Sequence, residues 1–528
     1  MPALIQRLKH FHLLSLPQIS YYLIFLAGVI LLYGRAIFFD LTFFDDHSWV
    51  KDAHALLSGG IPWWTFFSRP DLLTEFFYRP LLNLSFALDA RTGHGSLVSY
   101  HLTNLIIHWI NVCLVLRVLK EWGLSFSRAL AGALIFLVHP VLVQAVAWIP
   151  GRTDSLLGLF CFSGLLFFLR YLRLHRLWDL AAYALCLAGA VLTKETGAAL
   201  GFFTAAMSIV PDHFNRISWV QRIRAVVLTA CVLGVWLIIR GYVLRESADI
   251  SFNTGFQKFT ENLPALALHL GKVFWPVNLS VFPILKDSNL IYGLGAALVF
   301  LGWVLLSGHK NVGKVFWACA WFVLFLIPPL VFGGIHYEYR LYVPLLGVVI
   351  VCLELFPSCM SRIISGLLTV MIIGILAVTS WHYSAAYKDQ WSFWPRAAAQ
   401  APHSALAQRN LGAMYHVKGE ADAAFEYYQK ALALNPKEEI VHNNLGLLYQ
   451  VAGNDTKAAE HFKTEIQNHP ANYLAYYNLS LIMIHQNRLD EAARLLKAAA
   501  VLGPEDADVT NRLIEVQIRQ ERADADKK

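Results

Sequence analysis

The stretch ISYYLIFLAGVILLYGRAIFF, residues 19–39, is followed three residues later by FFDDHSW, residues 43–49. The first stretch is apolar and has the roughly 20 residues that an α-helix needs to cross a bilayer. The second places Asp45 and Asp46 at the mouth of that helix, where ionisable side chains are costly and mark a functional site by default. Because Asp also favours helix starts, the alternative is that the pair caps the next helix.

The rest of the chain divides into a long apolar part and a shorter polar part. Of its 528 residues, 57% are hydrophobic and 15% are charged, whereas a soluble protein has about 25% charged residues. We predict an all-α protein with a membrane domain at 1–386, a linker at 387–402 and a soluble domain at 403–528. The net charge of +7 does not indicate nucleic-acid binding, because the basic residues lie in short loops between apolar segments.

Hydropathy predicts about eleven membrane spans in the first domain. They lie at about 19–39, 97–118, 129–149, 154–172, 177–193, 196–211, 224–243, 289–307, 315–333, 340–356 and 362–383. Basic residues mark cytoplasmic loops, and alternate loops are rich in them, for example Arg117, Lys120 and Arg128, then Arg170, Arg173 and Arg176. This pattern places the N-terminus inside, and both Asp45 and the C-terminal domain on the outer side.

The polar C-terminal part contains an internal repeat of 34 residues. The columns in register are Pro402, Pro436, Pro470 and Pro504; Gly419, Gly453 and Asn487; Ala424, Ala458 and Ala492; and Tyr428, Phe462 and Leu496. This period, with small residues at helix crossings, is the tetratricopeptide pattern. It predicts an α-solenoid of stacked helix pairs, with a concave surface suited to an extended peptide. Tyrosines at 415, 449, 476 and 477 serve either that surface or the repeat core.

Five polar clusters interrupt the apolar part, and each falls on the predicted outer side. They are Asp45-Asp46, Tyr78-Arg79-Pro80-Leu81, Pro150-Gly151-Arg152-Thr153-Asp154, Lys194-Glu195-Thr196-Gly197 and His336-Tyr337-Glu338-Tyr339-Arg340. Each also has a purely structural interpretation. Arg79 would reach lipid headgroups, Arg340 would mark a helix start, and the charged pairs at 152 and 154 and at 194 and 195 would neutralise each other. Convergence on one side favours a shared site.

The residue types in these clusters suit a substrate with a phosphate and a reacting hydroxyl. Arg grips phosphate oxygens through paired hydrogen bonds, and a carboxylate accepts the proton of a nucleophile. We therefore predict Asp45 and Asp46 as catalytic residues. The predicted phosphate ligands are Arg79, Arg152, Lys194 and Arg340, and further candidates are His101, His139, Asp154, Glu195 and Glu338.

In their order along the chain, these motifs resemble those of the transmembrane and tetratricopeptide-repeat containing O-mannosyltransferases of the GT-C glycosyltransferase superfamily. The matching stretches are Phe44-Asp45-Asp46, Tyr78-Arg79-Pro80-Leu81, residues 100–108 (YHLTNLIIH), His139-Pro140, Gly151-Arg152-Thr153-Asp154, Lys194-Glu195-Thr196-Gly197 and Arg340-Leu341-Tyr342-Val343-Pro344. The repeat array is shorter, at roughly three to four units, which indicates a bacterial relative.

The resemblance implies a membrane enzyme that takes mannose from a polyprenyl-phosphate carrier on the non-cytoplasmic face. The sugar would pass to Ser or Thr of a protein acceptor held by the repeats. An acidic residue of the first outer loop, here Asp45 or Asp46, would act at the reaction centre. The implied location is the bacterial inner membrane with periplasmic repeats, or the endoplasmic reticulum membrane in a eukaryote.

A divalent metal ion is left open and not favoured by the sequence. Asp45, Asp46 and His47 are ligand types that bind divalent ions, but three adjacent residues rarely converge on one ion. Related O-mannosyltransferases look metal-independent, whereas GT-C oligosaccharyltransferases use a metal. No other cofactor is predicted.

Three alternatives to single-sugar transfer remain at this point. One is transfer of a preassembled lipid-linked oligosaccharide to protein. Another is a non-catalytic membrane scaffold that binds partners through its repeats, although a scaffold has no use for carboxylates and arginines in one layer. A transporter is the weaker alternative, because the charges gather at one face and form no path across the membrane.

Overall fold

The computed structural model describes residues 16–58, 62–71, 74, 76–210, 218–245, 252–277, 279–306, 312–331, 334–356, 361–504 and 506–525. Within these ranges the chain forms α-helices and 3₁₀-helices, and its one β-type pairing is an isolated antiparallel bridge between Ile284 and Ile335. The prediction of an all-α protein is therefore confirmed. The chain divides into two compact units, residues 1–393 and 394–528.

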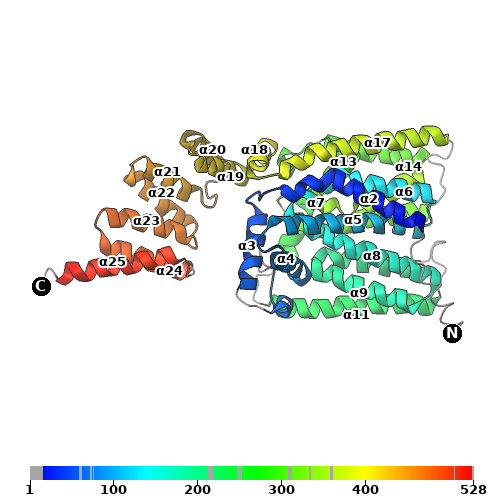
Figure 1. The fold of residues 1–528 in the computed structure, drawn as a ribbon, viewed down its shortest axis with the longest axis horizontal. Coiled ribbons are helices and arrows are strands. Elements are labelled where there is room, and N and C mark those ends of the chain that lie inside the picture. Colours follow the sequence, from blue (N-terminus) through cyan, green and yellow to red (C-terminus); the bar gives the residue numbers. More distant parts are fainter. Residues whose placement is uncertain are drawn as a thin grey trace. The chain divides into compact units, whose positions relative to one another are not determined.

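The first unit is a bundle of long helices that run roughly parallel (Figure 1). Its α-helices are α2 (Leu16–Tyr33), α3 (Asp45–Ser58), α4 (Pro80–Gly93), α5 (Leu97–Glu121), α6 (Phe126–Val138), α7 (Val143–Ala147), α8 (Arg152–Leu174), α9 (Leu177–Thr193), α10 (Ala198–Ile209), α11 (Trp219–Val243), α12 (Phe252–Asn262), α13 (Pro264–Phe274), α14 (Ile291–Leu306), α15 (Val312–Val331), α16 (Leu345–Leu355) and α17 (Arg362–Ser384).

Short 3₁₀-helices connect several of these elements. They are η1 (Gly34–Phe38), η2 (Trp63–Ser68), η3 (Pro140–Leu142), η4 (Ile149–Gly151), η5 (Glu195–Gly197), η6 (Leu285–Asp287), η7 (Glu338–Leu341) and η8 (Ala385–Tyr387). At the centre of the bundle α8 packs against both α5 and α9, and α3 packs against α4. Figure 1 shows α3 lying across one end of the long helices.

Each of the eleven predicted spans coincides with an apolar helix or a broken helix pair. In the described part of the chain, six helices are long and apolar enough to cross a membrane, and a seventh crossing exists if the bent pair 126–138 and 140–147 is one span. The other four predicted spans match the shorter helices α9, α10, α14 and α16. Residues 211, 307, 332 and 333, at the ends of three predicted spans, lie outside the described residues.

The predicted continuous span at 129–149 is broken in the structure. The helix axis turns by 51° between Val138 and Pro140. Proline lacks the backbone N–H that a continuing helix requires, and it also disfavours helical geometry at the residue before it, His139.

The second unit is a stack of helix pairs. Its elements are α18 (Gln390–Gln400), α19 (Ala405–Val417), α20 (Ala421–Leu434), α21 (Val441–Val451), α22 (Asp455–Asn468), α23 (Tyr473–His485), α24 (Leu489–Leu502) and α25 (Ala507–Ala525). Helix α18 begins in the first unit and occupies most of the segment predicted as a linker.

The 34-residue period has a direct structural cause in the turn inside each helix pair. Gly419, Gly453 and Asn487 adopt positive φ angles of 78°, 73° and 59°, a conformation that Gly and Asn tolerate best. At the helix crossings, Gly412 faces the ring of Tyr428 and Gly446 faces that of Phe462. The tyrosines at 415, 449, 476 and 477 pack against the repeat cores, which favours the core interpretation for them.

Candidate active site

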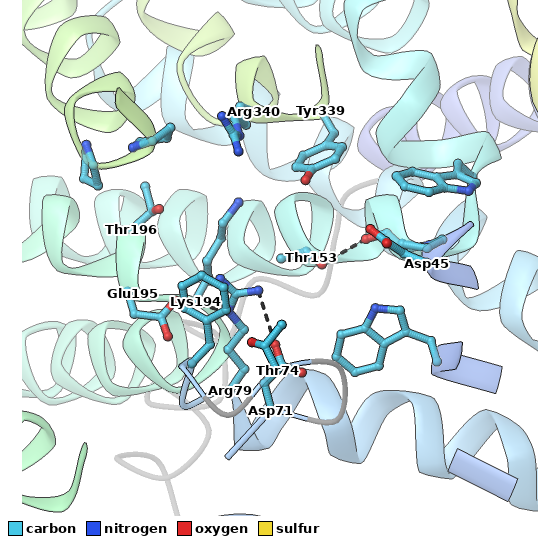
Figure 2. Close-up of a pocket in the computed structure, with 16 residues that line it drawn as sticks. Asp45, Asp71, Thr74, Arg79, Thr153, Lys194, Glu195, Thr196, Tyr339 and Arg340 are labelled. Atoms are coloured by element: carbon cyan, nitrogen blue, oxygen red, sulfur yellow. Dashed lines mark hydrogen bonds and ion pairs between the residues drawn. The ribbon is translucent and has the colours of Figure 1, made fainter. Parts of the chain in front are cut away.

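A cavity of about 320 Å³ lies in the first unit, lined by residues from helices, 3₁₀-helices and the segments between them. All five polar clusters of the sequence contribute to its lining. The lining residues are Asp45, Trp49, Asp71, Thr74, Phe77, Arg79, Trp148, Pro150, Thr153, Lys194, Glu195, Thr196, Pro328, Pro329, Tyr339 and Arg340. Segments that are almost 300 residues apart in sequence therefore meet at one site, as Figure 2 shows.

The two adjacent aspartates occupy different environments. Asp46 is 1% exposed, and its carboxylate accepts four hydrogen bonds: from the backbone N–H of Thr42 (2.6 Å), Phe44 (3.1 Å) and His47 (2.9 Å), and from the Thr42 hydroxyl (2.8 Å). Asp46 thus stabilises the turn that leads into α3. Asp45, the first residue of α3, lines the cavity instead.

Asp45 is poised to accept a proton near neutral pH. Burial is the main cause that raises the pKa of Asp45 to about 7, and the nearby charges of Asp46 and Asp71 add to it. A carboxylate with such a pKa is a stronger base than an exposed one and is about half ionised at neutral pH.

The turn before α3 also fixes one wall of the cavity. The indole N–H of Trp148 donates a hydrogen bond to the hydroxyl oxygen of Thr42 at 3.1 Å, and that hydroxyl donates to Asp46. Trp148 is 2% exposed and lines the cavity next to the η4 segment. Asp46 therefore helps to hold Trp148 in the cavity wall through the Thr42 hydroxyl. It also holds the turn that positions its neighbour Asp45.

Three cationic side chains face the cavity, and they differ in how they are neutralised. Arg79 Nε lies 3.1 Å from Glu195 Oε2, and its Nη1 lies 3.3 Å from Asp71 Oδ2. Lys194 Nζ lies 2.5 Å from Asp154 Oδ2. Neither of the pairs expected from sequence neighbours, 152 with 154 and 194 with 195, is an ion pair here, because each partner binds a residue from another element.

Arg340 is the cavity cation with no ion pair among the described residues, and its buried Nη1 has no hydrogen-bond partner there. Its guanidinium carbon lies 5.7 Å from the ring centre of Tyr337. In Figure 2, Arg340 and Lys194 lie across the cavity from Asp45. The cavity thus has the Asp45 carboxylate on one side and, on the other, a cation that has no ion pair in the described part of the chain.

The segment that carries Arg340 is held from behind by buried polar contacts. The side-chain oxygen of Gln144 accepts hydrogen bonds from the backbone N–H groups of Glu338 (2.9 Å) and Tyr339 (3.2 Å). The Glu338 carboxylate is fully buried and lies 2.8 Å from Lys272 Nζ. It also accepts a hydrogen bond from the Tyr383 hydroxyl at 2.9 Å. Glu338 therefore anchors η7 and does not line the cavity.

Two glycines in the polar clusters permit close backbone contacts. A Cβ atom on Gly151 would come within 2.1 Å of the Gln144 carbonyl oxygen. A Cβ atom on Gly197 would lie 2.4 Å from the carbonyl carbon of Ala190. Both positions therefore require Gly, and they let η4 and η5 fold tightly against the preceding helices beside the cavity.

The remaining predicted residues lie outside the cavity lining. Arg152 is fully buried and bound by Asp89, with 2.5 Å between Nη2 and Oδ2, and by Asn104, with 2.7 Å between Nε and Oδ1. His139 Nε2 lies 3.1 Å from the Val273 carbonyl oxygen. His101 is buried on α5, and Asp154 is buried against Lys194.

Several lining residues were not among the sequence candidates. Asp71 and Thr74 belong to an aromatic-rich segment that gives no catalytic signal. Trp49 follows Asp45 by four residues, a spacing that puts both on one face of a helix, so this signal was available. Tyr339 directly precedes Arg340 in the fifth polar cluster, so its sequence neighbourhood also pointed to it. Among the described residues, no three His, Cys, Asp or Glu side chains gather to hold a metal ion, and we assign no metal ligand.

Comparison with protein families identifies the C-terminal part. A family model described as Tetratricopeptide repeat matches residues 443–525, and one described as TPR repeat matches residues 412–453. Together these matches extend from the last part of α19 through α20 to the final helix α25.

Curated relatives share a single type of name. Protein O-mannosyl-transferase Tmtc2 of Drosophila melanogaster is 32% identical over 200 residues, which are 34% of this chain and 20% of that protein. Protein O-mannosyl-transferase F38B6.6 of Caenorhabditis elegans is 22% identical over 356 residues, 63% of this chain and 50% of that protein. Protein O-mannosyl-transferase TMTC3 of Homo sapiens is 32% identical over 126 residues, 23% of this chain and 13% of that protein.

The chain therefore spans half or less of the length of each of these relatives. The shared names and the repeat matches confirm the resemblance that the motifs predicted. Over part of its length the chain is similar to proteins named protein O-mannosyl-transferases, and its C-terminal unit contains tetratricopeptide repeats.

Proposed function

We propose that this chain is a membrane glycosyltransferase that moves one sugar, mannose, from a polyprenyl-phosphate donor to Ser or Thr hydroxyls of a protein. The observation that carries the proposal is the pairing within one cavity of Asp45, whose pKa is raised to about 7, with Arg340, which has no ion pair among the described residues. The names of the relatives support a glycosyl acceptor on protein.

Asp45 is the general base of the proposed reaction. Its carboxylate takes the proton of the acceptor hydroxyl while the hydroxyl oxygen forms a bond to the anomeric carbon. The bond between that carbon and the phosphate oxygen breaks, and the sugar is transferred with inversion. Asp46 holds the turn before α3 and so fixes the position of Asp45.

Arg340 is the main phosphate ligand. The phosphodiester of the donor carries one negative charge, and the departing polyprenyl phosphate gains a second. A preorganised cation stabilises charge that develops in the transition state. Because Arg79 is shared between Asp71 and Glu195 and Lys194 is bound to Asp154, these two cations are already neutralised. They shape the phosphate end of the cavity, and Arg152, which lies outside it, receives no phosphate role.

The cavity volume favours a single sugar over a preassembled glycan. At about 320 Å³ it lies at the small end of the usual range for ligand pockets, about 300–1,000 Å³. A purely scaffolding role gives no reason for a cavity-lining arginine that has no ion pair among the described residues. The buried Nη1 of Arg340 also has no hydrogen-bond partner there, and an unsatisfied buried donor is costly.

The proposed location is a membrane, with the cavity and the repeats on the non-cytoplasmic side. Mass spectrometry of envelope glycoproteins from cells with and without this protein tests the proposal. The expected result is loss of a single hexose from Ser or Thr residues. Loss of a long glycan would support oligosaccharide transfer, and an unchanged glycoprotein pattern would contradict both.

A further inference from the structure

Tyr339 presents a polar group inside the cavity. The residue belongs to η7, directly precedes Arg340 and is half-buried, and it lines the cavity. In Figure 2 its hydroxyl points into the cavity, with Arg340 and Lys194 toward one side and Asp45 toward the other. The polar end of the side chain, rather than a face of its ring, therefore meets a molecule bound in the cavity.

The ring that carries this hydroxyl is held on several sides. It stacks on the ring of Tyr337, with the ring centres 4.9 Å apart and the planes 15° apart, and its centre lies 6.3 Å from that of Trp148. Lys194 Nζ lies 5.3 Å from the centre of the Tyr339 ring. The backbone N–H of Tyr339 donates a hydrogen bond to the side-chain oxygen of Gln144 at 3.2 Å. The direction of the hydroxyl is therefore set before a substrate binds.

The hydroxyl of Tyr339 has no hydrogen-bond partner in the part of the chain that the structure describes. Nearby tyrosine hydroxyls are engaged, since that of Tyr342 lies 2.7 Å from His108 Nδ1 and that of Tyr383 donates to Glu338 at 2.9 Å. Burial raises the pKa of the Tyr339 hydroxyl above its ordinary value, so the group keeps its proton at neutral pH. The cavity thus contains an oriented hydrogen-bond donor that the described protein groups do not use.

We propose that the Tyr339 hydroxyl donates a hydrogen bond to the oxygen that joins the phosphate of the donor to its sugar, and that Tyr339 is thereby a catalytic residue. This inference rests on the proposed function. In a transfer with inversion, the attacking and the leaving oxygen lie on opposite faces of the sugar ring. With the attacking oxygen at Asp45 and the phosphate at Arg340, the leaving oxygen falls between these two residues, where the Tyr339 hydroxyl points.

The hydrogen bond acts on the step in which the sugar changes partners. The acceptor oxygen forms a bond to the anomeric carbon, and its proton goes to Asp45. The bond from that carbon to the bridging oxygen breaks, and its electron pair leaves with the phosphate. Tyr339 keeps its proton, and its hydrogen bond strengthens as negative charge grows on the bridging oxygen. A contact that strengthens in the transition state raises kcat more than donor affinity.

Other roles of the same hydroxyl make different predictions. A hydrogen bond to a sugar hydroxyl that does not react would contribute equally before and during the reaction. Its loss would raise the Kd for the donor and leave kcat unchanged. A role in packing belongs to the ring, which stacks on Tyr337 and which phenylalanine keeps. Tyr339→Phe therefore removes the proposed contact alone.

The test uses the purified full-length protein in detergent, with polyprenyl-phosphate mannose as donor and a Ser/Thr peptide as acceptor. We expect Tyr339→Phe to lower kcat about 10- to 150-fold, the range for loss of one hydrogen bond to a charged group, and to leave the Kd for the donor within about twofold. The retained Kd also shows that the variant is folded. Tyr242→Phe, which makes the same change at a residue of α11 that is 70% exposed, is the matched control and should change neither value.

The outcomes separate this inference from the proposed function. Wild-type kcat in Tyr339→Phe, beside low turnover by Asp45→Asn, would overturn the inference and leave the proposed function standing. A raised Kd with unchanged kcat would also overturn it, because the contact would then be made to a group that does not react. A wild-type protein that neither binds the donor nor transfers mannose would overturn the proposed function itself.

Discussion

Asp45 and Asp46 are neighbours in sequence, yet only Asp45 lines the cavity, while Asp46 accepts four hydrogen bonds within the turn before α3. The division follows from chain geometry, because successive residues at a helix start point in different directions. The contacts that stabilise the turn therefore belong to Asp46, whereas the proposed catalytic role falls to Asp45, which lines the cavity.

The first prediction concerns pH. Asp45 must be ionised to accept a proton, and its pKa is raised to about 7. Below that value the protonated, inactive form dominates, so kcat/KM should fall about tenfold for each pH unit and level off above pH 7. Asp71→Asn removes a negative charge that raises this pKa and should move the midpoint to lower pH. A rate profile that is flat between pH 5 and pH 8 would argue against a titrating base at this position.

The second prediction concerns the phosphate. Arg340→Ala should raise the Kd for polyprenyl phosphate by about 10- to 150-fold, because a hydrogen bond to a charged group contributes about 1.5–3 kcal/mol. Arg340→Lys should recover part of the loss, since it restores the charge but not the paired hydrogen bonds. Arg91→Ala, at an exposed position in the last turn of α4, is the control. Unchanged binding in Arg340→Ala would exclude the assigned phosphate role.

The third prediction concerns the repeats. A chain truncated after Trp394 should still transfer sugar to short peptides, because the cavity lies wholly in the first unit. Transfer to a full-length protein acceptor should drop sharply, since the repeats would no longer raise its local concentration. The ratio of the two rates, measured with one donor, is the readout. Equal ratios for the truncated and complete chains would assign the repeats to assembly or to another partner.

The fourth prediction concerns topology. Reporter fusions after Arg117 and Arg173 should report the cytoplasm, because these arginines lie near the ends of α5 and α8, beside further basic residues. Fusions after Asp154 and Tyr387 should report the opposite side. A cytoplasmic signal from the fusion after Tyr387 would place the repeats away from the proposed outer face and would require a different number of spans.

The residue patterns predicted the fold more completely than they predicted the side-chain contacts. The 34-residue period predicted the solenoid because the turn inside each helix pair requires the same positive φ angle. Gly419, Gly453 and Asn487 adopt that angle. Hydropathy located the eleven apolar segments but not the break at His139-Pro140, where one proline redirects the chain. The bundle places Asp45, Arg79, Lys194, Glu195 and Arg340 around one cavity, and the alternation of basic loops predicts a single side of the membrane for them.

The ion-pair partners of these residues could not be predicted from the sequence. Lys194 binds Asp154, 40 positions away, and Arg79 binds Glu195, 116 positions away. Such pairs depend on how helices pack and leave no local pattern. The burial of Arg152 has the same origin, because α4 and α5 enclose it with Asp89, Asn104 and Phe86. A polar motif in a membrane protein thus shows where charge is tolerated, whereas packing decides which member of the motif faces the substrate.

The most direct test of the central claim is turnover by purified Asp45→Asn with polyprenyl-phosphate mannose and a Ser/Thr peptide, compared with the wild-type protein. Asparagine keeps the size of the side chain but cannot accept the proton, so turnover should fall about 100-fold or more while donor binding is retained. Wild-type turnover by Asp45→Asn would contradict the account.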